Sequence, residues 1–196
     1  QSRILEFVRS SLPHAKAVIL SDYCKGVITR SLIKKLLELT GTKLFIAADP
    51  KIGQFDIYKG VSLITPNIHE ASFGSGIKIT DEVTLMKAGK ILMKKLRLKA
   101  LLITRGEQGM TLFEKSGKIV NIPTLAKEVY DVTGAGDTVI AAFSLCYASG
   151  MEYRESAEIA NHAAGIVVGE RGTAVVTREE IIESMKINRY LGNPKN

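Results

Sequence analysis

Residues 17–49 read AVILSDYCKGVITRSLIKKLLELTGTKLFIAAD, and this stretch decides the fold class. The apolar runs Ala17–Ser21 and Lys43–Ala48 are typical of short buried strands. Between them, Thr29 can cap a helix that continues to Leu39 with leucines along one face. A strand, a helix and a second strand in this order predict a parallel pair with the helix packed over it.

The same alternation continues along the rest of the chain. Further strands are predicted at Val61–Thr65, at Ala100–Thr104, and in a hairpin of Gly109–Phe113 and Lys118–Ile122 around Ser116-Gly117. Further helices are predicted at Arg3–Ser11, from Thr80-Asp81 onward, and at Asp137–Ala148, Tyr153–Gly169 and Arg178–Ile187. We therefore predict an α/β fold with a mostly parallel sheet covered on both faces, one domain over residues 1–191, and a disordered polar tail over 192–196.

Composition narrows the function classes. The chain has 196 residues, of which 45% are hydrophobic and 24% charged, as in ordinary globular proteins. No apolar run approaches the length of about 20 residues that spans a bilayer, so we expect a cytoplasmic protein without membrane contact. The net charge of +7 is spread along the chain without interleaved aromatic residues, which favours phosphorylated small molecules over nucleic acid as partners. The sequence leaves open whether the chain forms a homodimer.

The few cysteines and histidines indicate neither a disulfide framework nor a metal centre. Cys24 and Cys146 lie far apart and form no C-x-x-C pair, which favours free thiols. The three histidines show no metal-ligand spacing.

Polar residues gather where predicted strands end. Asp49-Pro-Lys51, Asn67–Glu70 and Thr104-Arg-Gly106 each follow a strand directly. In open α/β sheets the ligand lies beyond the carboxyl ends of the strands, so these three clusters are expected to share one site.

The strongest local signal is Asp131-Val-Thr-Gly-Ala-Gly-Asp137, which runs directly into an apolar helix. Gly134, Ala135 and Gly136 allow backbone amides to approach an anion closely, and the helix adds its positive N-terminal end. Asp137 stands beside this turn, where a carboxylate can accept the proton of an attacking hydroxyl. The alternative is a tight junction between loop and helix, with Asp137 as an ordinary first-turn acid. The G-x-x-x-x-G-K-[ST] spacing of a P-loop is absent.

Val129–Thr138 resembles the D-T-G-A-G-D signature of the PfkB/ribokinase family, with Val132-Thr133 extending it by one residue. The resemblance implies that Asp137 is the catalytic base and that Gly134 to Gly136 form the anion hole. It also implies a ribokinase-like three-layer α/β/α fold.

Two further elements occur in the family's order. Asn67-Ile-His-Glu70 resembles the N-x-x-E element, which implies that Asn67 binds the nucleotide's Mg²⁺ shell and that Glu70 holds Mg²⁺ through water. Read alone, the tetrapeptide is a common helix-start cap. Thr104, Gly106 and Gly109 match the T-x-G-x-x-G segment beside the nucleotide, and read alone they are a strand-to-turn glycine pair.

Two more residues complete the implied nucleotide site. Asn161 lies in a helix that resembles the one whose Asn lies near the adenosine, although read alone it is a helix-surface residue. Asp131 and the Val167–Gly172 backbone are the implied site for K⁺. The cofactors implied are therefore ATP, Mg²⁺ and K⁺.

Within the family, the phrases Val18–Val27, Ala48–Lys51 and Leu102–Met110 are similar to the heptose-phosphate kinase branch. This likeness implies phosphate transfer from ATP to the anomeric hydroxyl of a heptose 7-phosphate. Lys25 and Lys51 are then candidate partners for the sugar phosphate, and Asp22 is a candidate ligand for a sugar hydroxyl.

Two departures from the family pattern accompany this likeness. Cys24 stands where that branch leads us to expect glycine. The glycine-rich substrate-binding region and small lid strands that open the family domain are not in this chain, which we interpret as truncated at its N-terminus. Alternatives are a nucleoside or hexose kinase on the same scaffold, and a non-catalytic nucleotide-binding fragment.

Overall fold

The computed structural model describes residues 2–41, 44–125 and 129–191, with the side chains of 188–191 left out. Within these ranges six strands form one sheet: β1 Ala17–Ser21, β2 Phe45–Asp49, β3 Leu63–Ile64, β4 Ala100–Thr104, β5 Met110–Glu114 and β6 Ile119–Ile122. The strands follow chain order across the sheet; β1 to β4 pair in parallel, and β4 to β6 pair antiparallel. The predicted mostly parallel sheet and its terminal hairpin are confirmed.

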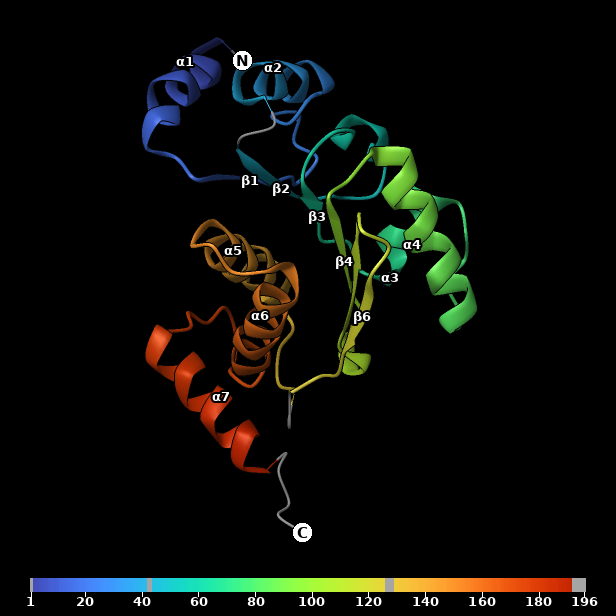
Figure 1. Cartoon of the computed structure of the whole chain (residues 1–196), viewed down its shortest axis with the longest axis vertical. Helices are drawn as coiled ribbons and strands as arrows, with labels where there is room; N and C mark the ends of the chain where they lie inside the picture. Colours follow the sequence, from blue (N-terminus) through green and yellow to red (C-terminus); the bar gives the residue numbers. More distant parts are fainter. Residues whose placement is uncertain (1, 42–43, 126–128, 192–196) are drawn as a thin grey trace.

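Helices cover both faces of this sheet (Figure 1). The described helices are α1 Ser2–Ser11, α2 Arg30–Thr40, α3 Ile68–Ser75, α4 Glu82–Leu96, α5 Ala135–Ala148, α6 Tyr153–Val167 and α7 Arg178–Leu191. Three short 3₁₀ turns lie at Leu12–His14, Phe55–Tyr58 and Gly106–Gln108. α2, α3 and α4 pack on one face, α5 and α6 pack on the other, and α7 lies outside α6.

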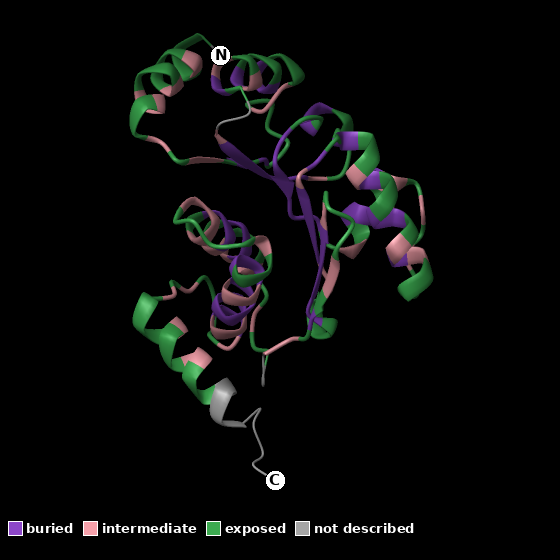
Figure 2. Cartoon of the chain, in the orientation of Figure 1, coloured by how far each residue is buried: buried purple, intermediate pink, exposed green. Residues whose placement is uncertain are grey.

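Alternating strand residues explain why both faces are covered. On β2, Ile46 and Ala48 join the core under α2 to α4, whereas Phe45 and Ala47 join the core under α5 and α6. Every residue of β2 is buried, as expected for a strand with helices on both sides. Figure 2 shows this buried band running through the strands and the inward faces of the helices.

Sequence reasoning found the long elements and missed one short one. Thr29 caps α2 by accepting a hydrogen bond from the Leu32 amide at 3.2 Å, as its residue type predicted. α3 is a helix that the sequence did not predict, although its start matches the cap interpretation of Asn67–Glu70. The third strand is shorter than the predicted Val61–Thr65 because only Leu63 and Ile64 pair in register on both sides.

Other boundaries moved by a few residues. α5 begins at Ala135 rather than Asp137, and α7 continues past the predicted Ile187. The predicted tail, 192–196, lies outside the described residues, and the single domain over 1–191 stays a prediction. Both cysteines are free thiols. Across the described ranges, no helix combines the length and the apolar character that crossing a membrane requires.

Gly89 lets α4 lie close against the hairpin. A Cβ built at Gly89 would lie 2.3 Å from a ring carbon of Phe113, which is itself only 2% exposed. The ring would have to shift within the packed core, so Gly89→Ala is expected to lower the free energy of unfolding by about 1–3 kcal/mol despite alanine's better helix propensity. Denaturant unfolding of the two proteins measures this difference.

Gly136→Ala is the matched control, since Gly136 is also helical and a Cβ there meets no atom within 4 Å. This variant should unfold at the same or higher denaturant concentration. Equal stability of Gly89→Ala and the unaltered chain would contradict the packing argument.

Candidate functional site

The carboxyl ends of β1, β2 and β3 bring three polar segments together at one edge of the sheet. β1 and β2 pair so that Ser21 lies opposite Asp49. Asp22 and Tyr23 follow the first strand, and Lys51 follows the second. Asn67 follows the third strand and begins α3. Because the strands are parallel, these segments leave the sheet on the same side. The sequence predicted this for the polar clusters after β2 and β3, whereas the segment after β1 was not among those clusters.

A lysine between two buried carboxylates forms one half of the site. Lys51 Nζ lies 2.6 Å from Asp49 Oδ2 and 3.5 Å from Glu70 Oε1. Asp49 and Glu70 are only 5% and 6% exposed. Burial raises the pKa of the Asp49 carboxyl, and the hydrogen bond and charge of Lys51 oppose that rise. Burial lowers the pKa of Lys51, but its carboxylate partners outweigh that effect and leave the pKa above the usual value.

Glu70 is held by a capping box at the start of α3. Its Oε2 accepts the Asn67 amide at 2.9 Å, and Asn67 Oδ1 accepts the Glu70 amide at 2.9 Å, the reciprocal pair that defines such a box. The helix-cap interpretation of this tetrapeptide is thus observed. The same capping geometry fixes Glu70 with its second oxygen turned toward Lys51.

Asp137 forms the other half of the site, in the first turn of α5. Gly134, with φ of +83°, precedes the helix in the left-handed region that favours glycine. A Cβ at Gly134 or at Gly136 would meet no atom within 4 Å, so the turn is open to an approaching ligand. The Asp137 carboxylate is exposed and accepts hydrogen bonds from Ser21 Oγ at 3.5 Å and from the Tyr23 hydroxyl at 3.0 Å.

Asp22 has a buried carboxylate with one hydrogen-bond donor on each oxygen. Its Oδ2 accepts the hydroxyl of Tyr58, and its Oδ1 accepts the Cys24 amide at 2.8 Å. Cys24 has φ of +54°, in the left-handed region where glycine fits best, and this explains why glycine was expected there. Lys25 is exposed and makes no ion pair within the described residues. Asp22 and Lys25 stay predicted substrate ligands.

The predicted nucleotide segments meet around Pro123. Gly109 lies so close to the chain after β6 that a Cβ would fall 2.1 Å from the Ile122 carbonyl oxygen. Asn161 is buried and donates from Nδ2 to the Pro123 carbonyl at 2.7 Å, so it is not a helix-surface residue. The glycine of the β4–β5 turn and the asparagine of α6 therefore hold the same short segment.

Thr104 ends β4, and Gly106 begins the 3₁₀ turn that leads to Gly109. The Thr104 amide donates to the Pro66 carbonyl at 3.0 Å, which ties the end of β4 to the start of α3. Gly106 has φ of +58° and open space beyond its Cα. The adjacent Arg105 pairs with Glu82 at the start of α4.

Asp131 lies where a monovalent cation was predicted. Its Oδ1 accepts the Thr133 amide at 2.9 Å, and its pKa is lowered by hydrogen bonds from Thr133 and from the Gly172 backbone. The Tyr130 amide donates to the Val168 carbonyl at 2.8 Å. Asp131 and the 167–172 backbone are therefore brought together as predicted, whereas binding of a cation there stays a prediction.

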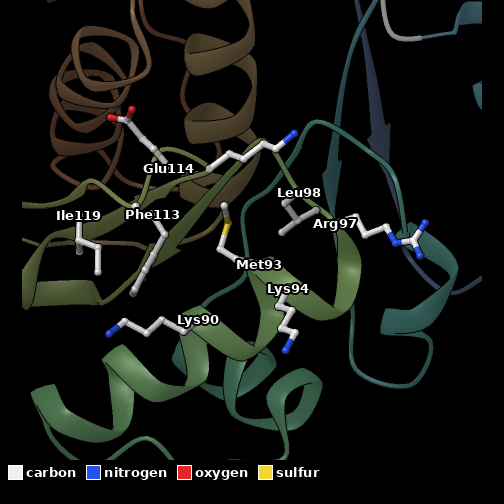
Figure 3. Close-up of a pocket in the computed structure, with 10 residues that line it drawn as sticks. Lys90, Met93, Lys94, Arg97, Leu98, Phe113, Glu114 and Ile119 are labelled. Atoms are coloured by element: carbon white, nitrogen blue, oxygen red, sulfur yellow. The ribbon is translucent and has the colours of Figure 1, made fainter.

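A separate hollow of about 530 Å³ lies between α4 and the β5–β6 hairpin (Figure 3). Phe113, Leu98 and Met93 form its apolar floor, and Lys90 and Lys94 stand on its rim. No predicted site residue lines it, and it lies toward the amino end of β4, away from Thr104. Lys94 lies in the last turn of α4, where a positive charge interacts favourably with the helix dipole.

Comparison with known proteins settles the family. The family model of "pfkB family carbohydrate kinase" matches residues 8–180. The chain belongs to the pfkB family of carbohydrate kinases. It is 44% identical over 186 residues to "Bifunctional protein HldE" of Geobacter metallireducens, and 39% identical over 196 residues to that of Geobacter sulfurreducens. These alignments cover 94% and 100% of this chain but only 38% and 40% of the relatives.

Solved structures of two kinases share the fold of this chain. Arabidopsis thaliana ribokinase, complexed with ribose and ATP, superimposes with a TM-score of 0.80 at 23% identity, covering 95% of this chain and 59% of that one. Phosphofructokinase-2 from Escherichia coli in complex with potassium has a TM-score of 0.80 at 16% identity, covering 96% and 62%. The predicted ribokinase-like α/β fold is confirmed.

The donor set of the pfkB site suits Mg²⁺ in its usual hydrated form. Asp49 and Glu70 supply hard oxygen atoms at this edge of the sheet, and the single positive charge of Lys51 lies between them. Within the described residues no group of three or more His, Cys, Asp or Glu side chains could hold a metal ion alone. Mg²⁺ needs no such cage, because it keeps several waters and binds substrate phosphates.

Sequence reasoning overlooked three residues of this site. Asp49 belongs to a predicted polar cluster but not to the predicted site residues, although it ends a fully buried strand. Ser21 and Tyr23 flank the predicted Asp22, and their partner Asp137 lies far along the chain. The alternation of side chains at the end of β1 could have indicated them. Ser21 and Tyr23 are neighbours of Asp22, so their side chains lie on the opposite side of the chain from its buried side chain.

Ionisation of the buried Asp49 carboxyl is predicted to destabilise the fold at neutral pH. Burial raises the pKa of Asp49 in the folded state above its unfolded value near 3.8. The protonated carboxyl therefore favours folding at low pH, and this contribution is lost as pH rises through the folded pKa. Asp49→Asn should therefore gain stability relative to the unaltered chain as pH rises from about 4 to 7. Denaturant unfolding at several pH values measures the difference.

Asp56→Asn, at a carboxylate whose side chain is 61% exposed, controls for the loss of one negative charge. A pH-independent difference between Asp49→Asn and the unaltered chain would show that burial does not govern this carboxyl.

Proposed function

We propose that this chain is the catalytic, nucleotide-binding part of an ATP-dependent sugar kinase whose acceptor is a sugar or sugar phosphate. The observation that carries the proposal is the position of Asp137. It stands in the first turn of α5, directly after an open glycine turn, and it lies at the same sheet edge as the Lys51, Asp49 and Glu70 cluster. The tight-junction alternative accounts for the turn but not for the charged cluster beside it.

The proposed mechanism assigns proton transfer to Asp137. Its exposed carboxylate accepts the proton of the acceptor hydroxyl as that oxygen attacks the γ-phosphorus. The first amides of α5 lack partners within the helix, although the Ala135 amide donates to the Val132 carbonyl at 3.2 Å. In this proposal the Gly134 to Gly136 turn and the helix N-terminus stabilise the negative charge that grows on the transferred group. The proton leaves the acceptor, the new O–P bond forms, and the bond to the ADP leaving oxygen breaks.

Asp49 and Glu70 are the proposed residues for the Mg²⁺ that accompanies the nucleotide phosphates. Mg²⁺, when bound with the nucleotide, would neutralise phosphate charge. Asp49 and Glu70 would hold its water shell, and Lys51 stands between them as a cation that can turn to a phosphate. Asn67 orients Glu70 through the capping box. Gly109 and Asn161 hold the segment at Pro123 against which the nucleoside would lie.

We further propose heptose 7-phosphate as the acceptor, phosphorylated at its anomeric hydroxyl. The phrases around Val18–Val27 and Ala48–Lys51 support this choice, as does likeness to relatives named bifunctional protein HldE. Asp22, Lys25 and Lys51 are the proposed acceptor ligands. The chain spans about two fifths of those relatives' length, so the activity of a longer protein is part of the proposal.

Nucleotide binding is the first test, by calorimetric titration of the chain with Mg-ATP. Gly134→Val should abolish saturable binding, because a branched side chain at φ of +83° strains the turn and fills the space above it. Gly117→Val, in the hairpin turn at φ of +91°, is the matched control and should bind normally. Absence of binding by the folded, unaltered chain would contradict the proposal, and equal binding by Gly134→Val would move the nucleotide elsewhere.

Asp137→Asn should keep nucleotide binding and lose phosphoryl transfer by roughly 10²- to 10⁴-fold, the range for removing a general base. Release of ADP in the presence of heptose 7-phosphate, ribose or a nucleoside measures transfer and compares acceptors. Near-normal transfer by Asp137→Asn would remove Asp137 from the role of base. Preference for ribose or a nucleoside would favour the alternative acceptors.

Potassium should activate the enzyme more than sodium, if Asp131 and the 167–172 backbone bind a monovalent cation. The lowered pKa of Asp131 keeps its carboxylate charged, and the Escherichia coli phosphofructokinase-2 structure was solved in complex with potassium. Transfer rates in matched potassium and sodium salts test this site. Equal rates would contradict it.

A further inference from the structure

The Tyr23 hydroxyl contacts Asp137, and the proposed mechanism assigns this contact no role. The side chain of Tyr23 is 60% exposed and follows β1, yet its hydroxyl donates to Asp137 Oδ2 at 3.0 Å, across 114 residues of sequence. Ser21 Oγ, two residues earlier, donates to the other oxygen, Oδ1, at 3.5 Å. Side chains at the end of β1 therefore contact both oxygens of the exposed Asp137 carboxylate.

Folding stability does not explain this arrangement. An exposed hydrogen bond between side chains adds little to stability, because water offers both groups equivalent partners. Tyr23 also lies outside both buried clusters of the core. A tyrosine whose ring is exposed but whose hydroxyl is fixed on a single carboxylate is better explained by what it does to that carboxylate.

The geometry has a direct chemical consequence. The terminal torsion of an aspartate is broad, so a free carboxylate on the first turn of a helix rotates widely. The Tyr23 hydroxyl, at 3.0 Å, restricts the plane of the Asp137 carboxylate, and the Ser21 hydroxyl, at 3.5 Å, adds a weaker restraint on the other oxygen. A carboxylate offers about four lone-pair sites, so after these two donors it can still accept a hydroxyl from the open side. Tyr23 and Ser21 leave the carboxylate oriented but available.

We propose that Tyr23 is a positioning residue for Asp137, holding the carboxylate in the plane in which it accepts the proton of the acceptor hydroxyl. This inference rests on the proposed function, because it requires Asp137 to be the base. Tyr23 acts through Asp137 and touches neither phosphate nor nucleotide. Ser21 assists from the other oxygen, with the longer and weaker contact.

The pairing itself is tested without turnover, by following phenolate absorbance as pH rises. The pKa of Tyr23 is raised, first by its hydrogen bond to Asp137 and then by the charge of that carboxylate. The absorbance change that belongs to Tyr23 is the difference between the titration curves of the unaltered chain and of Tyr23→Phe. In Asp137→Asn the ionisation of Tyr23 should occur at lower pH. An unchanged ionisation would overturn the pairing, whether or not the chain transfers phosphate.

Kinetics test the consequence for catalysis. Tyr23→Phe keeps the ring and removes only the hydroxyl, so kcat should fall about tenfold while KM for Mg-ATP stays the same, as for a misdirected base. In an Asp137→Asn background, Tyr23→Phe should cause no further fall, since the residue acts only through Asp137. If Tyr23 had a purely structural role, Tyr23→Phe would lower kcat by the same factor with and without Asp137→Asn.

Tyr147→Phe is the matched control. Tyr147 lies at the far end of α5, stacked on Tyr153 with ring centroids 4.6 Å apart, and loss of its hydroxyl should leave transfer unchanged. Full transfer by Tyr23→Phe, with transfer lost in Asp137→Asn, would overturn the role of Tyr23 alone. Full transfer by Asp137→Asn would instead overturn the proposed base, and the two failures are thus distinguished.

Discussion

The parallel pairing of β1 with β2 is the constraint on which the site depends. Its register sets Ser21 opposite Asp49, so the chain leaves both strands at the same level of the sheet. Tyr23 and Lys51 each lie two residues further on, and their side chains consequently project into one shared space. A slip of one residue would turn one of these segments to the opposite face and separate the two halves of the site.

α5 adds the third contribution to this edge, and its own packing determines where Asp137 lies. Phe143 on α5 is fully buried against the sheet and stacks with Phe45 of β2 at a centroid distance of 6.3 Å. Val139 and Ile140 are buried in the same cluster. Because a helix is rigid over this length, burying these residues fixes its first turn beside the end of β1. The apolar core thereby sets the distance between a carboxylate and a phenol.

The site also concentrates features that folding alone would disfavour. Asp49 and Glu70 are carboxylates nearly removed from solvent, Cys24 adopts a left-handed backbone, and Gly134 opens a turn that no side chain fills. Each is compensated locally, by Lys51, by the Asp22 carboxylate and by the start of α5. Such a combination suits a pre-organised site at which carboxylates hold a hydrated cation and a glycine turn approaches phosphate, since these groups must be in place before the ligand arrives.

The sequence by itself determined the alternation of strands and helices, the cap at Thr29, the hairpin at Ser116-Gly117 and the glycine turn before α5. These follow from hydrogen bonding and side-chain periodicity over a few neighbouring residues, which a linear pattern records. It also showed that Asn67 and Glu70 belong together and offered a helix-start cap as one interpretation of them. Only the tertiary structure decided that Tyr23 contacts Asp137, that Lys51 joins Asp49 to Glu70, and that Asn161 is buried against Pro123. These contacts link distant parts of the chain, and their partners are chosen by the packing of α3, α5 and α6 on the sheet rather than by any local preference.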